Sequence, residues 1–234
     1  MSDQFSRTAM LFGRDNIEKL KNRRVAVFGI GGVGGHTVEA LCRSGVGYID
    51  IFDGDIVDIT NINRQTIATH KTIGLDKTTV MKERLLDINP DATVYAKKLF
   101  YLPDTADEVD LSVYDYIVDA VDTMTAKLEL VCRAFALEVP IISSMGAANK
   151  IDPTALEVAD IFETSICPMA RIMRRELRKR KVTALKVVYT KEVPVEPTEV
   201  EYRPASHRQV PGSCAFVPSV AGLILAAEVI KGLL

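Results

Sequence analysis

Short apolar bursts alternate with longer amphipathic stretches along the first 145 residues. The bursts are rich in β-branched residues and often end at Gly, Pro or Asp, a pattern typical of buried strands. The stretches between them repeat apolar positions at helical spacing. The predicted strands are residues 24–28, 48–52, 93–96, 116–120 and 139–143. The predicted helices are residues 16–21, 32–44, 77–88 and 124–137.

Strands that alternate with helices of this length form βαβ units. We therefore predict an α/β fold, with a Rossmann-like, mostly parallel sheet flanked by helices. The rhythm changes after residue 150, where we expect a C-terminal α+β extension. This extension contains predicted strands at 155–162 and 186–190, a basic helix at 169–181, a proline-rich loop at 192–211 and an apolar helix at 219–233. The last helix is apolar on nearly every side, which predicts burial in the core or at a subunit interface.

The composition is that of an ordinary globular protein, with 47% hydrophobic and 26% charged residues among 234. We expect a single domain over 1–234, divided into a core at 1–145 and an extension at 146–234. The net charge of −2 provides no global attraction to nucleic acid, so any basic surface must be local. Four scattered cysteines without a C-x-x-C pair argue against a zinc ribbon and a disulfide framework. With no apolar signal segment or membrane span evident, they favour a cytoplasmic protein.

A glycine-rich loop lies directly between the first predicted strand and its helix. Gly29, Gly31 and Gly34 form G-x-G-x-x-G, with Gly32 inside the motif. Such a loop lets the backbone approach phosphate, and the helix N-terminus supplies N–H donors. Asp53 ends the next strand, where an acid can accept hydrogen bonds from ribose hydroxyls. The alternative is a tight turn without a ligand, and the motif alone does not separate NAD from ATP.

A second polar run favours ATP over a nicotinamide. Arg64 and Lys77 provide two cations just beyond the glycine loop, and Asp122 follows the fourth strand. When a carboxylate attacks the α-phosphate of ATP, Arg, Lys and Mg²⁺ hold the developing charge. Asp122 is the candidate Mg²⁺ ligand. Taken singly, the two cations could be solvated and Asp122 a helix cap.

The ordered motifs resemble the ubiquitin-activating-enzyme-like adenylating superfamily over residues 5 to about 145. They are Arg7, G-I-G-G-V-G at 29–34, D-G-D at 53–55, N-I-N-R-Q at 61–65, Lys77 and D-A-V-D at 119–122. The resemblance implies that the glycines cradle ATP and that Asp53 binds its ribose. It implies a phosphate-binding role for Asn61, Arg64 and Lys77. It also implies that Asp55 and Gln65 belong to the same nucleotide site and that Arg7 enters the site of a neighbouring subunit in a homodimer.

The second half resembles the branch of this superfamily that dehydrates threonylcarbamoyladenosine in tRNA. The motifs are F-S-R-T-A-M-L-F-G at 5–13, G-A-A-N-K-I-D-P-T at 146–154, P-M-A-R at 168–171 and G-S-C-A-F-V-P-S-V-A-G at 212–222. This implies that ATP activates the threonyl carboxylate as an acyl-adenylate and that the carbamoyl group then displaces AMP. The alternative is adenylation of the Gly-Gly end of a ubiquitin-like sulfur carrier. Two other functions remain as alternatives, a non-catalytic nucleotide sensor and a nicotinamide-dependent oxidoreductase. A sulfur-relay protein remains as an alternative partner.

The predicted helix at 169–181 is strongly basic. Arg171, Arg174, Arg175 and Arg178 share one helical face, and Glu176 is the acid among them. We expect this face to contact tRNA phosphates. The alternative is a solvated amphipathic helix that packs through its apolar side.

Overall fold

The computed structural model describes residues 3–202 and 209–234, and within them seven strands form one sheet in the order β3-β2-β1-β4-β5-β7-β6. All neighbours are parallel except β6 and β7, which pair antiparallel. The strands are β1 (Arg24–Phe28), β2 (Tyr48–Asp53), β3 (Thr93–Lys98), β4 (Tyr116–Asp119), β5 (Ile141–Ser144), β6 (Leu156–Asp160) and β7 (Lys186–Thr190). The predicted α/β class and the mostly parallel sheet are confirmed.

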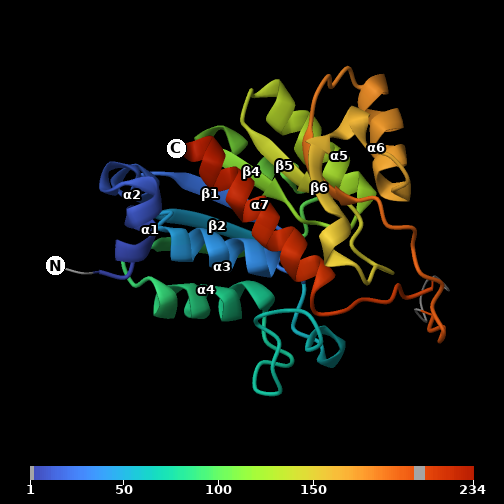
Figure 1. Ribbon diagram of the computed structural model, residues 1–234, viewed down its shortest axis with the longest axis horizontal. Coiled ribbons are helices and arrows are strands. Elements are labelled where there is room, and N and C mark those ends of the chain that lie inside the picture. The colour runs from blue at the N-terminus through green and yellow to red at the C-terminus, as the bar shows by residue number, and fades with distance from the viewer. Residues whose placement is uncertain (1–2, 203–208) are drawn as a thin grey trace.

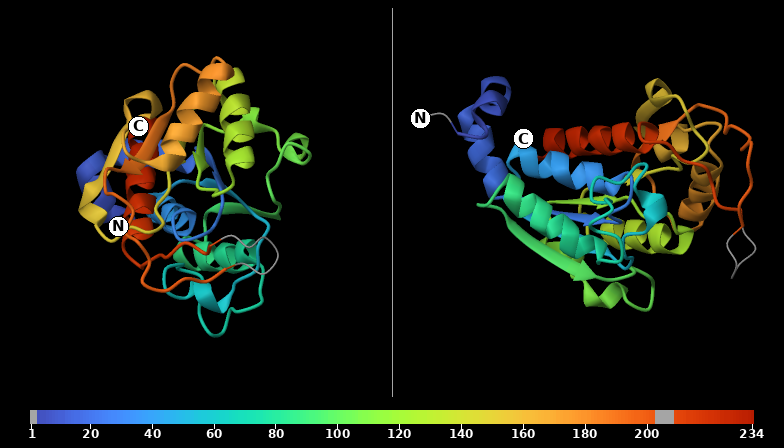
Figure 2. Two further views of the ribbon diagram at one scale, coloured as in Figure 1. Left: turned by 90° about the vertical axis from the view of Figure 1, so that its right-hand side faces the viewer. Right: turned by 90° about the horizontal axis from the view of Figure 1, so that it is seen from below.

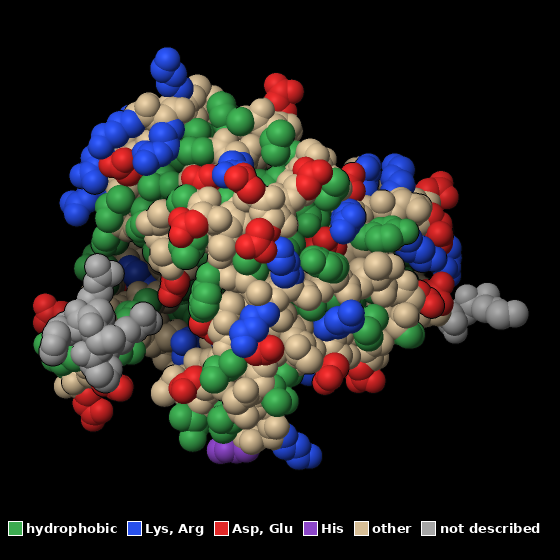
Figure 3. Space-filling view, turned by 180° about the vertical axis from the view of Figure 1, so that it is seen from behind, with side chains coloured by type: hydrophobic (Ala, Val, Ile, Leu, Met, Phe, Trp, Pro, Cys, Tyr) green, Lys and Arg blue, Asp and Glu red, His purple; other side chains and the backbone are tan. Residues whose placement is uncertain are grey.

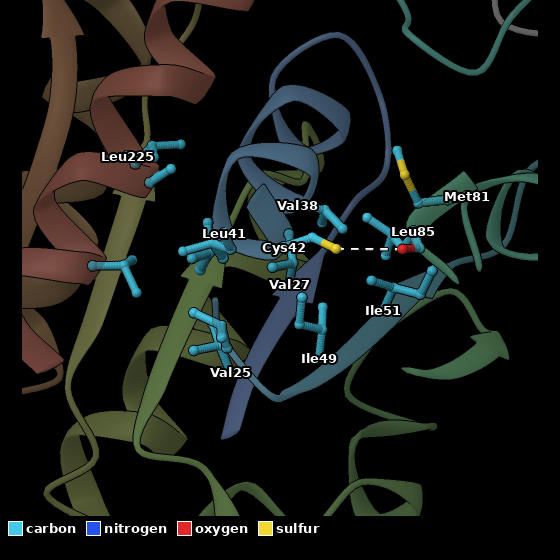
Figure 4. Close-up of a cluster of buried hydrophobic side chains, with 14 of the residues drawn as sticks. Val25, Val27, Val38, Leu41, Cys42, Ile49, Ile51, Met81, Leu85 and Leu225 are labelled. Carbon is cyan, nitrogen blue, oxygen red and sulfur yellow. Dashed lines mark hydrogen bonds between the residues drawn. The ribbon is translucent and has the colours of Figure 1, made fainter. Parts of the chain in front are cut away.

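Helices cover both faces of the sheet (Figure 1). They are α1 (Ser6–Phe12), α2 (Arg14–Lys21), α3 (Gly34–Ser44), α4 (Lys77–Ile88), α5 (Met124–Ala136), α6 (Pro168–Lys179) and α7 (Val217–Leu233). Alternate residues of β1 face two hydrophobic clusters on opposite sides of the sheet. Val25 and Val27 pack with residues of α3, α4 and α7, whereas Ala26 and Phe28 pack on the side of α5. Figure 4 shows the first cluster around Val27 and Leu41.

The structure adds one helix and shortens one predicted strand. Residues 6–12, for which no element was predicted, form helix α1, whose Phe5 cap residue is buried. The strand predicted at 155–162 ends at Asp160, because the Asp160 carboxylate accepts from the backbone N–H groups of Phe162 and Leu185 and starts a 3₁₀ turn. The proline-rich loop at 192–211 is irregular where described, and its residues 203–208 lie outside the described part.

The apolar helix α7 lies alongside α3 (Figure 2). Gly222 permits this approach, because a Cβ there would collide with the carbonyl oxygen of Val33 and lie 2.9 Å from the Cβ of His36. Thr37 Oγ1 donates to the Gly222 carbonyl at 3.0 Å. The helix predicted to be buried is therefore buried in this chain's own core. No helix among the described residues is long and apolar enough to cross a membrane.

Replacing Gly222 tests this packing. Gly222→Val should lower the free energy of unfolding by about 1–3 kcal/mol, because the added side chain forces α7 away from α3. Urea unfolding followed by circular dichroism measures the change. Leu223→Ala is the control on the next, half-exposed position and should change stability by less than about 0.5 kcal/mol. Equal losses in the two variants would contradict the close contact at Gly222.

Candidate active site

The carboxyl ends of β1, β2 and β4 open into a cavity of about 1170 Å³. Ligands bind at this edge in open α/β sheets. Most residues predicted for a nucleotide site line it, namely Gly29, Gly31, Gly32, Asp53, Asp55, Asn61, Arg64, Gln65, Lys77 and Asp122. The cavity therefore brings together residues that span more than ninety positions of sequence.

The glycines of the loop have two different roles. Gly29 has φ +87°, and a Cβ on it would lie 2.7 Å from the carbonyl oxygen of Ala120. A Cβ on Gly34 would overlap the carbonyl of Gly29, so Gly34 lies beneath the loop rather than along the cavity. A Cβ on Gly31 would meet nothing closer than Gln65 Nε2 at 3.9 Å. Gly29 and Gly34 thus make the tight turn, whereas Gly31 leaves an open floor for a phosphate.

Asp53 fixes the glycine loop as well as facing the cavity. Its Oδ2 accepts from the backbone N–H of Ile30 at 2.6 Å, and its Oδ1 accepts from that of Asp55 at 2.8 Å. Burial raises the pKa of Asp53, while Lys77 and the two N–H donors act in the opposite direction. The sequence motif pointed to ribose binding, but gave no sign that the same carboxylate holds the loop in place.

Lys77 lies between two carboxylates on the cavity wall. Its ammonium is 2.8 Å from Asp55 Oδ2 and 4.0 Å from Asp53 Oδ1, and the residue is only 5% exposed. The two carboxylates offset the cost of desolvating this buried cation. Lys77 is therefore positioned at the start of α4 as a fixed positive group beside the glycine loop.

The loop after β2 places two amides beside the glycines. A 3₁₀ turn, Ile59–Asn61, begins at Asp58, whose backbone N–H donates to Asn61 Oδ1 at 3.2 Å. Gln65 is 6% exposed, and its Oε1 has no hydrogen-bond partner within the described residues. A buried amide oxygen without a partner is costly, and it belongs to a side chain that lines the cavity beside Gly31.

Arg64 is half-buried on the same loop. Its Nη1 donates to the carbonyl of Thr60 at 2.9 Å and to Asn63 Oδ1 at 2.8 Å, which fixes the guanidinium. Burial lowers its pKa, and no carboxylate among the described residues offsets that shift. A phosphate group would restore the missing negative partner.

A buried ion pair stabilises the connection between β4 and α5, which includes Asp122. Lys127 Nζ donates to Asp119 Oδ2 at 2.9 Å and to the Val121 carbonyl at 3.0 Å, and both paired side chains are fully buried. Ser143 Oγ also donates to Asp119 Oδ2. Asp122 itself is exposed on the cavity rim, bonded to the Thr123 hydroxyl at 3.3 Å. The sequence motif at 119–122 includes Asp119 but gave it no role, and Lys127, eight positions further along the chain, was missed.

Arg7 is not brought to this cavity. It is exposed on α1, which packs near the C-terminal end of α3, since Phe5 lies within 3.6 Å of a Cβ placed on Gly45. The glycine loop is at the other end of α3. Figures 1 and 2 show the N-terminal helices at the end of the molecule opposite the proline-rich segment that borders the cavity.

The four arginines of the basic face differ in what they contact. Arg171, Arg175 and Arg178 are exposed, and Figure 3 shows basic side chains gathered around α6. Arg174 instead donates to the carbonyl and hydroxyl of Thr164, so it holds the preceding loop. Arg178 also lies 5.1 Å over the ring of Phe162.

Glu176 forms ion pairs with neighbouring cations of helix α6. Arg180, Lys179 and Arg175 surround it, and their hydrogen bonds lower the pKa of Glu176 to about 2. The helix packs down through Ala170, Met173 and Leu177. The exposed positive face that remains is therefore smaller than the four-arginine stripe expected from sequence.

The fold and the cavity define a Rossmann-like nucleotide-binding protein. The chain belongs to the ThiF family, whose model matches residues 5–234. It is 43% identical to the tRNA threonylcarbamoyladenosine dehydratase of Bacillus subtilis strain 168, across all of this chain and 96% of that protein. It is 36% identical to the Escherichia coli K12 dehydratase of the same name, across 75% of this chain and 65% of that one.

Solved structures agree with this assignment. The Escherichia coli tRNA N6-threonylcarbamoyladenosine dehydratase in complex with AMP superposes with a TM-score of 0.89 at 30% identity. That match covers 98% of this chain and 93% of the other. The same Escherichia coli protein has been solved with ATP. The resemblance drawn from sequence motifs is confirmed.

Breaking the buried ion pair should be costly. Lys127→Met leaves the Asp119 carboxylate buried without its partner, and we expect a loss of about 3–5 kcal/mol in the free energy of unfolding. Lys97→Met is the matched control, because Lys97 pairs with the half-exposed Glu108 at 2.7 Å and should contribute about 0–1 kcal/mol. Chemical denaturation of both variants measures the difference, and similar losses would overturn the role given to Lys127.

Proposed function

We propose that this protein uses ATP to dehydrate threonylcarbamoyladenosine in tRNA to its cyclic form. The observation that carries the proposal is the full-length match to a dehydratase of that name. The cavity supports it, because the glycine loop, Arg64, Lys77 and Gln65 provide a floor, two cations and an amide for a nucleoside triphosphate. Because its substrate is tRNA, we place the protein in the cytoplasm.

In the first step, a threonyl carboxylate oxygen attacks the α-phosphorus. The bond between that phosphorus and its bridging oxygen breaks, and pyrophosphate leaves. Arg64 and Lys77 hold the charge that accumulates on the phosphate oxygens, and the open backbone at Gly31 admits the phosphate chain. Asp53 positions the ribose through oxygens that also hold the glycine loop.

In the second step, the carbamoyl group attacks the activated acyl carbon. The bond from that carbon to the AMP oxygen breaks and the carbamoyl group releases one N–H proton, so AMP carries away the oxygen that the nucleoside loses. Water must be excluded at this stage, since its attack on the same carbon would regenerate the carboxylate and release AMP.

Mg²⁺ fits the rim of the cavity. Asp122 supplies one exposed carboxylate, and no group of three or more metal-binding side chains occurs in the described part of the chain. Mg²⁺ is commonly bound by one or two carboxylates together with substrate phosphates. When bound there, it would neutralise phosphate charge, and Asp122 would hold it.

We propose that the exposed face of α6 binds the tRNA backbone. Arg171, Arg175 and Arg178 supply the cations, while Arg174 positions the preceding loop. Helix α6 begins beside the carboxyl end of β5, because Met169 is the neighbour of Gly146 there. Phosphates bound along α6 would therefore lead toward the edge of the sheet that holds the cavity.

We also propose a homodimer in which Arg7 completes the partner's site. Arg7 cannot reach its own cavity from the opposite end of the sheet. Next to it, Met10 and Leu11 are each 82% exposed on α1, an apolar surface that a second copy would cover. Arg7, the exposed cation of α1, would then act in the partner's cavity.

A nucleoside assay tests the reaction. The protein is incubated with ATP, Mg²⁺ and tRNA that carries threonylcarbamoyladenosine, and the digested nucleosides are analysed by mass spectrometry. We expect loss of one water from that nucleoside, with AMP and pyrophosphate formed. Arg64→Ala should reduce turnover by at least ~10²-fold, as loss of a charge-stabilising donor does. Unchanged nucleoside, together with pyrophosphate exchange stimulated by a Gly-Gly carrier protein, would favour the carrier reaction instead.

Mixed dimers test the contribution of Arg7. Arg7→Ala and Arg64→Ala chains are coexpressed with different tags and purified through both. If Arg7 acts in trans, the mixed dimer has one intact site and about half of wild-type activity, although each parent variant is inactive. An inactive mixed dimer would overturn the contribution of Arg7 in trans.

A further inference from the structure

Two motifs of the C-terminal extension meet in the fold. G-A-A-N-K-I-D-P-T at 146–154 follows β5, and G-S-C-A-F-V-P-S-V-A-G at 212–222 leads into α7. Between them in sequence runs a segment whose described parts, residues 195–202 and 209–213, we call the cover. Glu199, Val200, Val210 and Gly212 from the cover line the nucleotide cavity.

Asn149 binds both ends of the cover. Its carbonyl accepts from the N–H of Val195 at 2.8 Å, and its N–H donates to the carbonyl of Gly212 at 2.8 Å. Its side-chain Oδ1 accepts from the N–H of Gly212 at 2.6 Å. Asn149 has φ +55°, a left-handed conformation that Asn tolerates better than most residues. One residue thus joins two segments that lie seventeen positions apart in sequence.

Neighbours of Asn149 strengthen the same junction. Lys150 is 4% exposed, and its ammonium donates to the carbonyl of Glu192 just before the cover. The Glu192 carboxylate accepts from the N–H of Ile151 at 2.9 Å and from that of Asp152 at 3.1 Å. After the cover, the thiol of Cys214 donates to the Lys150 carbonyl at 3.4 Å.

The cover also reaches the phosphate-binding loop. Asn63 Nδ2 donates to the carbonyl of Ser213 at 3.0 Å, one position beyond the Asn149 contact. Asn63 in turn accepts from Arg64. The end of the cover at Gly212 and Ser213 is therefore held on one side by Asn149 and on the other by the loop that carries Arg64.

We propose that Asn149 is a positioning residue that seats the cover over the acyl-adenylate and keeps water from it. The proposal rests on the function given above. Asn149 does not line the cavity, so it acts through the cover rather than by touching substrate. Without its side-chain bond, the cover loosens at Gly212, and water reaches the acyl carbon. Attack by water breaks the bond to AMP, regenerates the threonyl carboxylate and wastes one ATP.

The test separates the side chain from the backbone conformation. Asn149→Gly keeps the left-handed backbone and its two main-chain bonds, and removes only the acceptor for Gly212. Asn149→Asp retains an oxygen acceptor. The ratio of AMP formed to cyclic nucleoside formed is measured for each. We expect Asn149→Gly to raise the ratio several-fold, and Asn149→Asp to stay near wild type. Glu138→Gly is the matched control, since Glu138 has φ +57° at an exposed site after α5.

A second measurement stands apart from the dehydration reaction. The dissociation rate of a fluorescent ATP analogue should rise several-fold in Asn149→Gly and stay unchanged in Glu138→Gly. Wild-type values of both the product ratio and the dissociation rate in folded Asn149→Gly would overturn the proposal. If wild-type protein forms no cyclic nucleoside, the proposed function fails, while the dissociation rate still decides whether Asn149 seats the cover.

Discussion

The buried carboxylate of Asp53 is the constraint on which the site depends. It ends β2, binds the backbone of the glycine loop at Ile30 and lies within 4.0 Å of the Lys77 ammonium. One side chain therefore holds the loop and lies beside a cation at the start of α4. Because burial raises its pKa, the ionised form is maintained by Lys77 and by two N–H donors. Any change that removes one of these partners disturbs the others as well.

Acidic side chains outnumber basic ones among the described residues that line the cavity. Among the described lining residues, the carboxylates are Asp53, Asp55, Asp58, Asp122, Glu199 and Glu201, and the cations are Arg64 and Lys77. A nucleoside triphosphate adds further negative charge, so a complete site needs cations from elsewhere. The proposed Mg²⁺ ion and the partner subunit's Arg7 would meet that need. The shortage of positive charge in the cavity links the metal, the dimer and the reaction, although each rests on different residues.

Local patterns predicted the sheet and the members of the site, but not the contacts that hold them. Strand spacing and G-x-G-x-x-G gave the fold class and located the cavity, because both depend on neighbouring residues. The Asp119–Lys127 pair and the junction at Asn149 depend on side chains that meet only after folding. Helix α1 was not predicted, because residues 5–13 were interpreted only through their resemblance to a family motif. Likewise, helical spacing placed four arginines on one face, but it gave no sign that Arg174 bonds to Thr164.

The contact between Gly222 of α7 and Thr37 of α3 joins residues 185 positions apart. During synthesis, α3 and the glycine loop leave the ribosome long before α7 exists to cover them. The apolar surface of α3 must stay open until then, since no earlier helix occupies the place of α7 beside it. Such long-range closure slows folding and prolongs exposure to chaperones and to aggregation. The nucleotide site of this protein is thus among the last parts of the chain to mature, even though its central motif is among the first to be made.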